Sequence, residues 1–245
     1  TSGTIALFGK DVSLDPLHVP THVGYMPQEA RALNNLSVGE ALFFTARLRG
    51  MGRRDARRER DRLMARWEIG HLRDKYSSRL SGGELRLLRL AVAMIGRPPV
   101  LILDEPTNDL APQRRRLVWE MLGELNRDHG TTIIFITHDA IEAERAIQRV
   151  GIMREGELVA VGAPSELKRQ VDRQLRLELL FHPSLPPRLP EGLDVHELQP
   201  GRWITWIDRE DASAVLDKLA LDELEDFRLY SATLEDLYVH YLNQV

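Results

Sequence analysis

The sequence predicts an α/β protein built on a parallel sheet, followed by a small α+β module. From residue 100 onward, apolar strand-like runs alternate with amphipathic helical stretches, which is typical of parallel strands joined by crossover helices. The composition changes after Gly162, and an irregular connection is marked by Pro183, Pro186, Pro187 and Pro190. We therefore expect two domains, residues 1–164 and 165–245.

Length and composition support this division and narrow the class of protein. The 245 residues are enough for one large domain and a small one. A net charge of −4 argues against a nucleic-acid-binding protein. No run approaches 18 apolar residues, so we expect no membrane span in this sequence. The lack of cysteines excludes disulfides and thiolate-bound metals within it.

The first third of the chain predicts two short strands and then helices. Ile5–Phe8 and Val23–Met26 have strand-like patterns. The capping-box pattern Ser37-x-x-Glu40 begins a helix that runs to Arg49.

Residues 47–62 carry eight arginines against three acids. The spacing of Arg57 with Asp61 and of Glu59 with Arg62 favours a solvated helix that is held by ion pairs. The alternative is a docking surface for a partner or for lipid headgroups.

The remaining elements follow in order, as strand 100–103, helix 112–130, strand 131–137, helix 140–147 and a hairpin over 150–161 that turns at Glu155-Gly156. In the C-terminal module we expect strands at 175–181, 203–207 and 227–230, with helices at 212–221 and from Leu234 onward.

One predicted helix begins with the run Ser81-Gly82-Gly83-Glu84. Ser81 and Glu84 fit a capping box, which is a sufficient structural reason for those two residues. The capping box does not explain the two glycines. They bare N–H groups where the helix dipole places about half a positive charge, which suits a phosphate oxygen.

Asp104 and Glu105 follow four apolar residues, so both are expected at the carboxyl end of a core strand, the edge where open α/β sheets bind ligands. Asp104 is suited to hold Mg²⁺, and Glu105 is suited to orient or deprotonate an attacking water. Two acids that simply open a loop are the alternative.

His138 ends the strand 131–137 and is expected at the same sheet edge, where it could donate to a phosphate oxygen. Gln28 follows the strand 23–26 and carries an amide able to meet a metal-bound water. Taken alone, each is more simply a bystander. The phosphate loop Gly-x4-Gly-Lys-Ser/Thr occurs nowhere in these residues, and its nearest match, Gly9-Lys10, is followed by Asp11.

In the order Gln28, Ser81-Gly82-Gly83, Asp104-Glu105 and His138, the sequence resembles the nucleotide-binding subunit of ATP-binding cassette (ABC) transporters. These positions match the family's Q-loop, signature motif, Walker B motif with its catalytic glutamate, and H-loop. Ser81 and Asp104 are 23 positions apart, and Glu105 and His138 are 33 apart. The resemblance covers about residues 1–165. It implies a P-loop NTPase-like (ABC ATPase) parallel sheet with a helical subdomain at about 29–96.

The resemblance implies an ATPase that uses ATP and Mg²⁺. Ser81, Gly82, Gly83 and Glu84 would contact a partner's nucleotide, whereas Asp104, Glu105, Gln28 and His138 would serve the subunit's own. Catalysis would rest on Glu105 and His138, and Mg²⁺ on Asp104 and Gln28. The implied partners are a second nucleotide-binding subunit and a separate transmembrane permease, without nucleic acid. The implied location is peripheral, at the cytoplasmic face of the plasma membrane.

The stretch from Glu105 to Pro112 and the ending 231–238 look like the drug- and antibiotic-export (ABC-2 type) branch, although related ATPases move polysaccharides, ions or lipids. The alternatives are a non-catalytic regulatory subunit and a soluble ABC-type ATPase. There are no long heptad arms and no zinc-spacing cysteines to support the latter.

Two departures from the family pattern matter. The phosphate loop would lie ahead of Thr1, so the sequence is expected to be N-terminally truncated. This exact fragment is expected to bind ATP poorly and to be inactive alone. Ala111 stands where the family has its D-loop aspartate. The absence of that aspartate is expected to slow or desynchronise hydrolysis. The C-terminal module carries no chemical motif; its apolar pattern predicts its own core, with dimer contact or regulation as the alternative.

Overall fold

The structure is a computed structural model, which describes residues 3–28, 35–138, 144, 146–171, 174–190 and 193–243. The chain forms two compact units, Thr1–His138 and Asp139–Val245. The domain boundary after residue 164 stays a prediction. Among the described residues, no helix combines the length and the apolar character that crossing a membrane requires.

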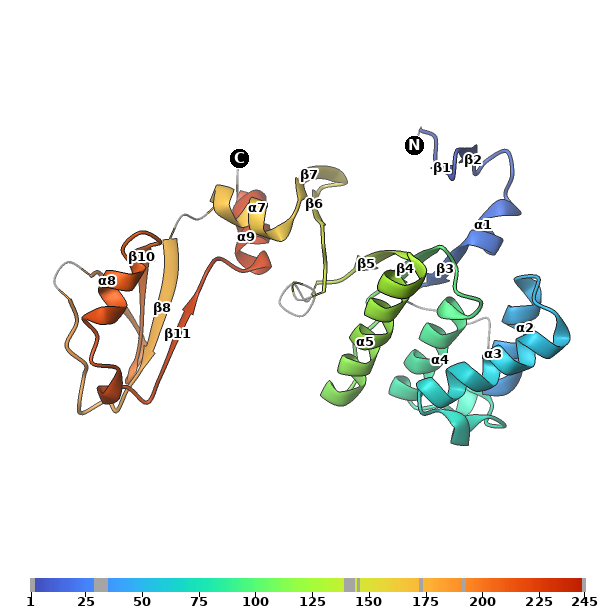
Figure 1. Ribbon diagram of the computed structural model, residues 1–245, viewed down its shortest axis with the longest axis horizontal. Coiled ribbons are helices and arrows are strands. Elements are labelled where there is room, and N and C mark those ends of the chain that lie inside the picture. Colours follow the sequence, from blue (N-terminus) through green and yellow to red (C-terminus); the bar gives the residue numbers. More distant parts are fainter. Residues whose placement is uncertain are drawn as a thin grey trace. The chain divides into compact units, whose positions relative to one another are not determined.

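The first unit is built on a parallel sheet of three strands, β3 (Val23–Met26), β4 (Val100–Asp104) and β5 (Thr132–Ile136), in that order. The helices α4 (Gly82–Met94) and α5 (Pro112–His129) pack on one face of it (Figure 1). Leu101 and Leu103 of β4 are fully buried in this core. The register pairs Met26 with Leu103, and Asp104 with Ile136, so the carboxyl ends of all three strands share one edge.

Gly24 in β3 allows this close packing. A β-carbon at that position would collide with the Ala93 carbonyl of α4 and with the Leu101 side chain. The sheet and α4 therefore approach at a distance that no larger residue permits.

The ends of α4 and α5 follow the sequence signals. Ser81 and Glu84 form the predicted capping box of α4. Pro112 occupies the first turn of α5, and Gly130 ends it with a φ of 65°, a conformation that favours glycine. The expected helix 112–130 and strand 100–103 are confirmed to within one residue.

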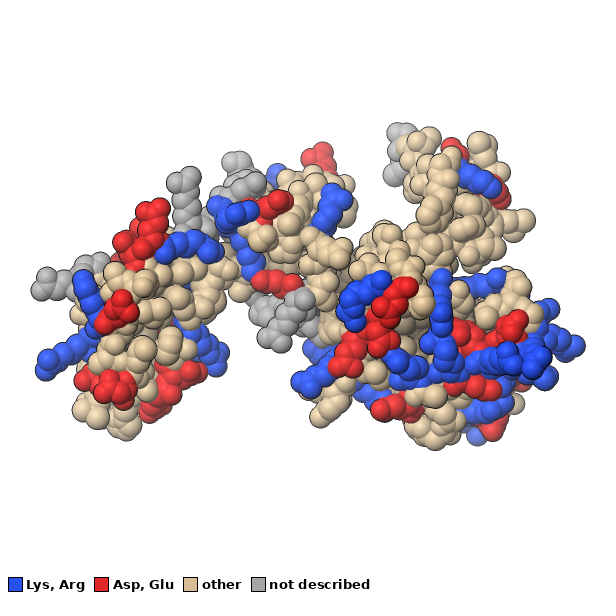
Figure 2. Space-filling view, in the orientation of Figure 1, with Lys and Arg blue, Asp and Glu red and all other residues tan. Residues whose placement is uncertain are grey.

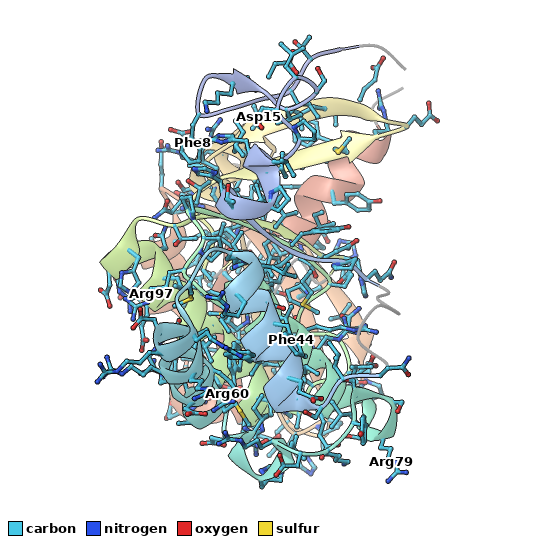
Figure 3. All side chains as sticks on the ribbon, turned by 90° about the vertical axis from the view of Figure 1, so that its right-hand side faces the viewer. Phe8, Asp15, Phe44, Arg60, Arg79 and Arg97 are labelled. Atoms are coloured by element: carbon cyan, nitrogen blue, oxygen red, sulfur yellow. The ribbon has the colours of Figure 1, made fainter. Side chains whose placement is uncertain are left out.

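The helical part of the unit contains α2 (Val38–Leu48), α3 (Arg53–Arg66) and the short 3₁₀ turns η1 (Gly70–Leu72) and η2 (Ser77–Arg79). The predicted capping box of α2 is present. The core of this helical part includes the fully buried Leu42, Leu63 and Trp67. Figure 3 shows α2 from the side that bears the half-exposed Phe44.

Helix α3 differs from the solvated helix expected over residues 47–62. It begins only at Arg53, after the turn at Gly50, and it buries Ala56, Leu63 and Met64. The predicted pair of Glu59 with Arg62 forms at 2.7 Å. The predicted pair of Arg57 with Asp61 is wrong, because Asp61 pairs with Arg60 and Arg73 instead. Basic side chains nonetheless gather on the surface around α3, with acidic ones among them (Figure 2).

The N-terminal segment forms a small hairpin, β1 (Ala6–Leu7) with β2 (Lys10–Asp11), and then a short helix, α1 (His18–His22), that the sequence analysis did not predict. Phe8 at the hairpin turn is exposed (Figure 3).

The second unit contains a hairpin, β6 (Val150–Arg154) and β7 (Glu157–Gly162), with α7 (Pro164–Val171) and α9 (Leu234–Asn243) packed around Ile152, Leu167 and Leu237. It also contains a four-stranded antiparallel sheet of order β11-β8-β10-β9.

These strands are β8 (Gln174–Leu180), β9 (Val195–Gln199), β10 (Arg202–Asp208) and β11 (Asp226–Tyr230), accompanied by α8 (Ala212–Asp217) and η3 (Leu221–Glu223). The sheet and α8 enclose a core of their own around Leu177 and Ile207, as expected for the module. The sequence patterns did not predict β9 or α7. The expected helix 140–147 lies largely outside the described residues.

Candidate functional site

Glu105 and His138 meet at the carboxyl edge of the parallel sheet. Glu105 directly follows β4, and its backbone N–H donates to the Ile136 carbonyl of β5 at 2.9 Å. Its Oε1 accepts from the backbone N–H of His138 at 3.1 Å and lies 2.6 Å from the imidazole Nδ1. Its Oε2 accepts from the Thr137 hydroxyl at 3.2 Å. The Glu105 side chain is 12% exposed, whereas the His138 side chain is 76% exposed.

This arrangement determines what each group can offer. An ionised carboxylate only accepts hydrogen bonds, so the Nδ1 of His138 is the donor in their contact. The remaining nitrogen, Nε2, is then an acceptor in the neutral ring and a donor in the protonated ring. Glu105 is held by three donors, which fixes the carboxylate in one orientation beside an exposed imidazole.

Asp104 and Gln28 extend the same edge. Asp104 is the last residue of β4. Gln28 lies two residues beyond Met26, the last residue of β3, which pairs with Leu103 of β4. The Gln28 backbone carbonyl accepts from Nη1 of Arg89 at 3.3 Å, which ties this loop to α4. No group of three or more His, Asp or Glu side chains suited to a metal occurs in the described part of the chain. Asp104 nevertheless fits Mg²⁺, because that ion commonly takes only one or two carboxylates beside phosphate and water.

At the N-terminus of α4, Ser81 and Glu84 cap each other, and Lys75 from outside the helix joins them. The Ser81 N–H donates to Glu84 Oε2 at 2.8 Å, and the Glu84 N–H donates to Ser81 Oγ at 3.4 Å. Lys75 Nζ donates to the same Oε2 at 2.9 Å. The bond from Lys75 and then the bond from Ser81 lower the pKa of Glu84 below its ordinary value. The Glu84 carboxylate thus serves the cap, and its nucleotide contact stays a prediction.

The two glycines that follow Ser81 have no packing reason. Gly82 is exposed, and a β-carbon there would meet no described atom within 4 Å. At Gly83 the nearest atoms would lie at 3.8 Å, an ordinary contact. Both residues lie in the first turn of α4, and glycine favours a helix less than alanine does. The bare helix start therefore points to something that must approach the backbone closely.

Two further side chains at this edge were missed by the sequence analysis. Arg86 of α4 donates to the Glu105 carbonyl and to Asp109, and Thr137 holds the Glu105 carboxylate. A lone arginine inside a helix and a threonine at a strand end carry no local signal for these contacts. The position of Ala111 is also now clear, because it is the N-cap residue of α5 and provides no side-chain hydrogen bond.

Comparison with known proteins agrees with this geometry. The family model described as ABC transporter matches residues 1–108. Human ATP-binding cassette sub-family A member 2 is 33% identical over 202 residues, which cover 82% of this chain and 8% of that protein.

Two further human relatives are similar. The retinal-specific phospholipid-transporting ATPase ABCA4 is 34% identical over 180 residues, covering 74% of this chain and 8% of that protein. The phospholipid-transporting ATPase ABCA3 is 34% identical over 190 residues, covering 76% and 11%. This chain thus spans about a tenth or less of the length of these relatives. The predicted drug-export branch is not confirmed by them.

Solved structures show the fold. The ATP binding subunit of an ABC transporter aligns with a TM-score of 0.64 at 22% identity, over 69% of this chain and 70% of that one. The dimeric ATP-binding cassette MJ0796 bound to ADP and Pi aligns with a TM-score of 0.61 at 19% identity, over 66% and 74%. The predicted ABC ATPase fold is confirmed.

Proposed function

Because the chain carries an ABC transporter ATP-binding domain, we propose that it pairs with a second such domain and hydrolyses ATP to drive transport through a membrane subunit. The observation that carries this proposal is the Glu105–His138 contact at the sheet edge that also bears Asp104. In this proposal the domain lies at the cytoplasmic face of the plasma membrane.

Within one subunit, the residues at the sheet edge have separate roles in hydrolysis. Glu105 orients the attacking water, because its carboxylate is fixed by three donors and lies beside an exposed imidazole. His138 faces the phosphate through Nε2, and protonation of the ring makes that nitrogen a donor. Asp104, together with the Gln28 amide, would hold Mg²⁺, which when bound neutralises charge on the phosphates.

The exposed start of α4 is proposed to act on the partner's nucleotide. Ser81 and Gly82 are exposed, and neither glycine is required by packing within the chain. A helix N-terminus with bare N–H groups favours a phosphate oxygen. Two domains arranged head to tail would place each such helix start over the other's triphosphate.

A phospholipid is the cargo that the similar proteins favour, since two of them are named as phospholipid-transporting ATPases. A drug-like molecule is the alternative that the C-terminal pattern suggested. Reconstitution of the full-length protein with its membrane subunit separates them: phospholipid should stimulate ATP hydrolysis more than an amphipathic drug does. The reverse order would favour the export of drugs.

The test of the enzyme itself is Glu105→Gln in the full-length protein. The variant should bind ATP, lose hydrolysis by about 100-fold or more, and remain as an ATP-dependent dimer in light scattering. A non-catalytic regulatory subunit would instead show no hydrolysis in the wild type. Unchanged turnover in the variant would remove Glu105 from the mechanism.

A further inference from the structure

Arg86 joins the signature helix to the loop that carries the catalytic glutamate. It lies in α4, five residues after Ser81, and its side chain is 11% exposed. Nη1 donates to the Glu105 backbone carbonyl at 2.7 Å, and Nη2 donates to Asp109 Oδ2 at 3.3 Å. A single planar guanidinium therefore holds both ends of the loop 105–109.

The two residues that Arg86 contacts have unusual backbones. Glu105 has a φ of 48° and Asp109 a φ of 61°, in the left-handed region that residues with a side chain rarely adopt. Such conformations persist only where surrounding contacts hold them. Three groups of Glu105 are anchored. The Glu105 N–H bonds to β5, the Glu105 side chain bonds to Thr137 and His138, and the Glu105 carbonyl accepts from Arg86.

The two bonds from Arg86 are not equivalent. The Asp109 side chain is 79% exposed, and an ion pair of that kind contributes little in water. The bond to the Glu105 carbonyl is shorter and is made by a largely buried guanidinium. It is therefore the contact that we expect to determine the position of the loop.

We propose that Arg86 is a positioning residue that makes the glycine-bared start of α4 and the Glu105 loop move as one body. The inference rests on the proposed function in one respect: residues 81–83 act on a partner's nucleotide, while Glu105 acts on the subunit's own. Contact at the start of α4 is then transmitted through a rigid helix and one guanidinium to the loop bearing the Glu105 carboxylate. Closure of one nucleotide site thereby changes the position of the Glu105 loop that serves the other site.

The test compares Arg86→Met and Arg86→Lys with the wild-type full-length protein. Arg116→Met is the matched control, because Arg116 is an exposed arginine on α5. Steady-state ATP hydrolysis should show kcat at least ten-fold lower for Arg86→Met, with KM for ATP within about three-fold, because the phosphate-binding groups are untouched. Lysine can reach only one of the two acceptors, so Arg86→Lys should lie between. Arg116→Met should match the wild type.

Hydrogen–deuterium exchange provides a readout that does not depend on hydrolysis. The backbone amides of Glu105 and of residues 107–110 should exchange several-fold faster in Arg86→Met, and those of β4 should not. Unchanged exchange there, or kcat within two-fold of the wild type, would overturn the inference. If the wild type hydrolyses no ATP, the proposed function fails while exchange still decides the role of Arg86. Should Arg86→Met not fold, Arg86→Lys decides, and wild-type kcat and exchange in it contradict the proposal.

Discussion

The Glu105 carboxylate accepts from the backbone N–H of His138 at 3.1 Å and lies 2.6 Å from its imidazole Nδ1. One part of this contact belongs to the backbone and the other to the side chain. A substitution at His138 therefore removes the imidazole without removing the backbone bond that orients the carboxylate.

We expect His138→Ala to lower turnover by about 100-fold, the usual effect of losing one donor to a developing negative charge. Thr137→Val is the control, because it also removes one bond to Glu105 but leaves the imidazole in place. Its loss should stay below about ten-fold. Steady-state hydrolysis by the full-length protein measures both. Equal losses would mean that the imidazole serves only to orient Glu105.

We expect Gly82→Ala to fold at least as stably as the wild type. The added methyl group would meet no described atom, and alanine is favoured over glycine in a helix by up to about 1 kcal/mol. Its ATP-dependent dimerisation and turnover should nevertheless fall, because a methyl group stands where a phosphate must approach. Urea unfolding and light scattering test the two parts.

Gly24→Ala is the matched substitution, and it should have the opposite effect on stability. Its β-carbon would collide with the Ala93 carbonyl, so the free energy of unfolding should fall by about 1–3 kcal/mol or more. For Gly82→Ala, full activity would show that the approach of a phosphate does not require glycine at this position.

We expect Ala111→Asp to stabilise the first unit by about 1 kcal/mol. Ala111 is the N-cap of α5, with a φ of −61° and a ψ of 152°, but it has no side chain to cap the helix. The first turn contains arginines and no acid, so an aspartate also suits the helix dipole. Chemical unfolding should show the gain, and Ala111→Val, which cannot cap, should show none. A gain of the same size in the valine variant would rule out capping as its cause.

The pH dependence of stability should change in Glu84→Gln. Lys75 and the Ser81 N–H lower the pKa of Glu84, so its charged form stabilises the fold above the ordinary glutamate pKa. That contribution is lost as the pH falls through the lowered value. The amide keeps the cap but not the charge, so we expect the wild type to be more stable at pH 7 by about 0.5 kcal/mol, after screening by solvent.

Urea midpoints measured between pH 7 and pH 3 should therefore converge for the two proteins. Glu40→Gln is the control at the other capping box, where only Ser37 lowers the pKa and no lysine takes part. Its gap from the wild type should vary less with pH. A Glu84→Gln gap that persists at pH 3 would contradict the linkage.

Much of the first unit follows from residues close together in the sequence. Both capping boxes, the proline that begins α5 and the glycine that ends it lie where the sequence predicts them. These signals act within about one helical turn, so they survive without knowledge of the fold. The missed elements α1, α7 and β9 are short segments in which such signals are weak.

Only the tertiary structure decided which side chains meet. His138 reaches Glu105 across 33 positions because parallel strands end at one edge, and Arg86 reaches the Glu105 carbonyl across 19 because α4 packs beneath that edge. Residue type alone could not assign the arginine to that carbonyl. The sequence by itself determined the helix caps, the strand endings and the order of the chemical groups. Their contacts were decided by packing, since hydrogen bonds between distant residues depend on the distance between backbones rather than on local preference.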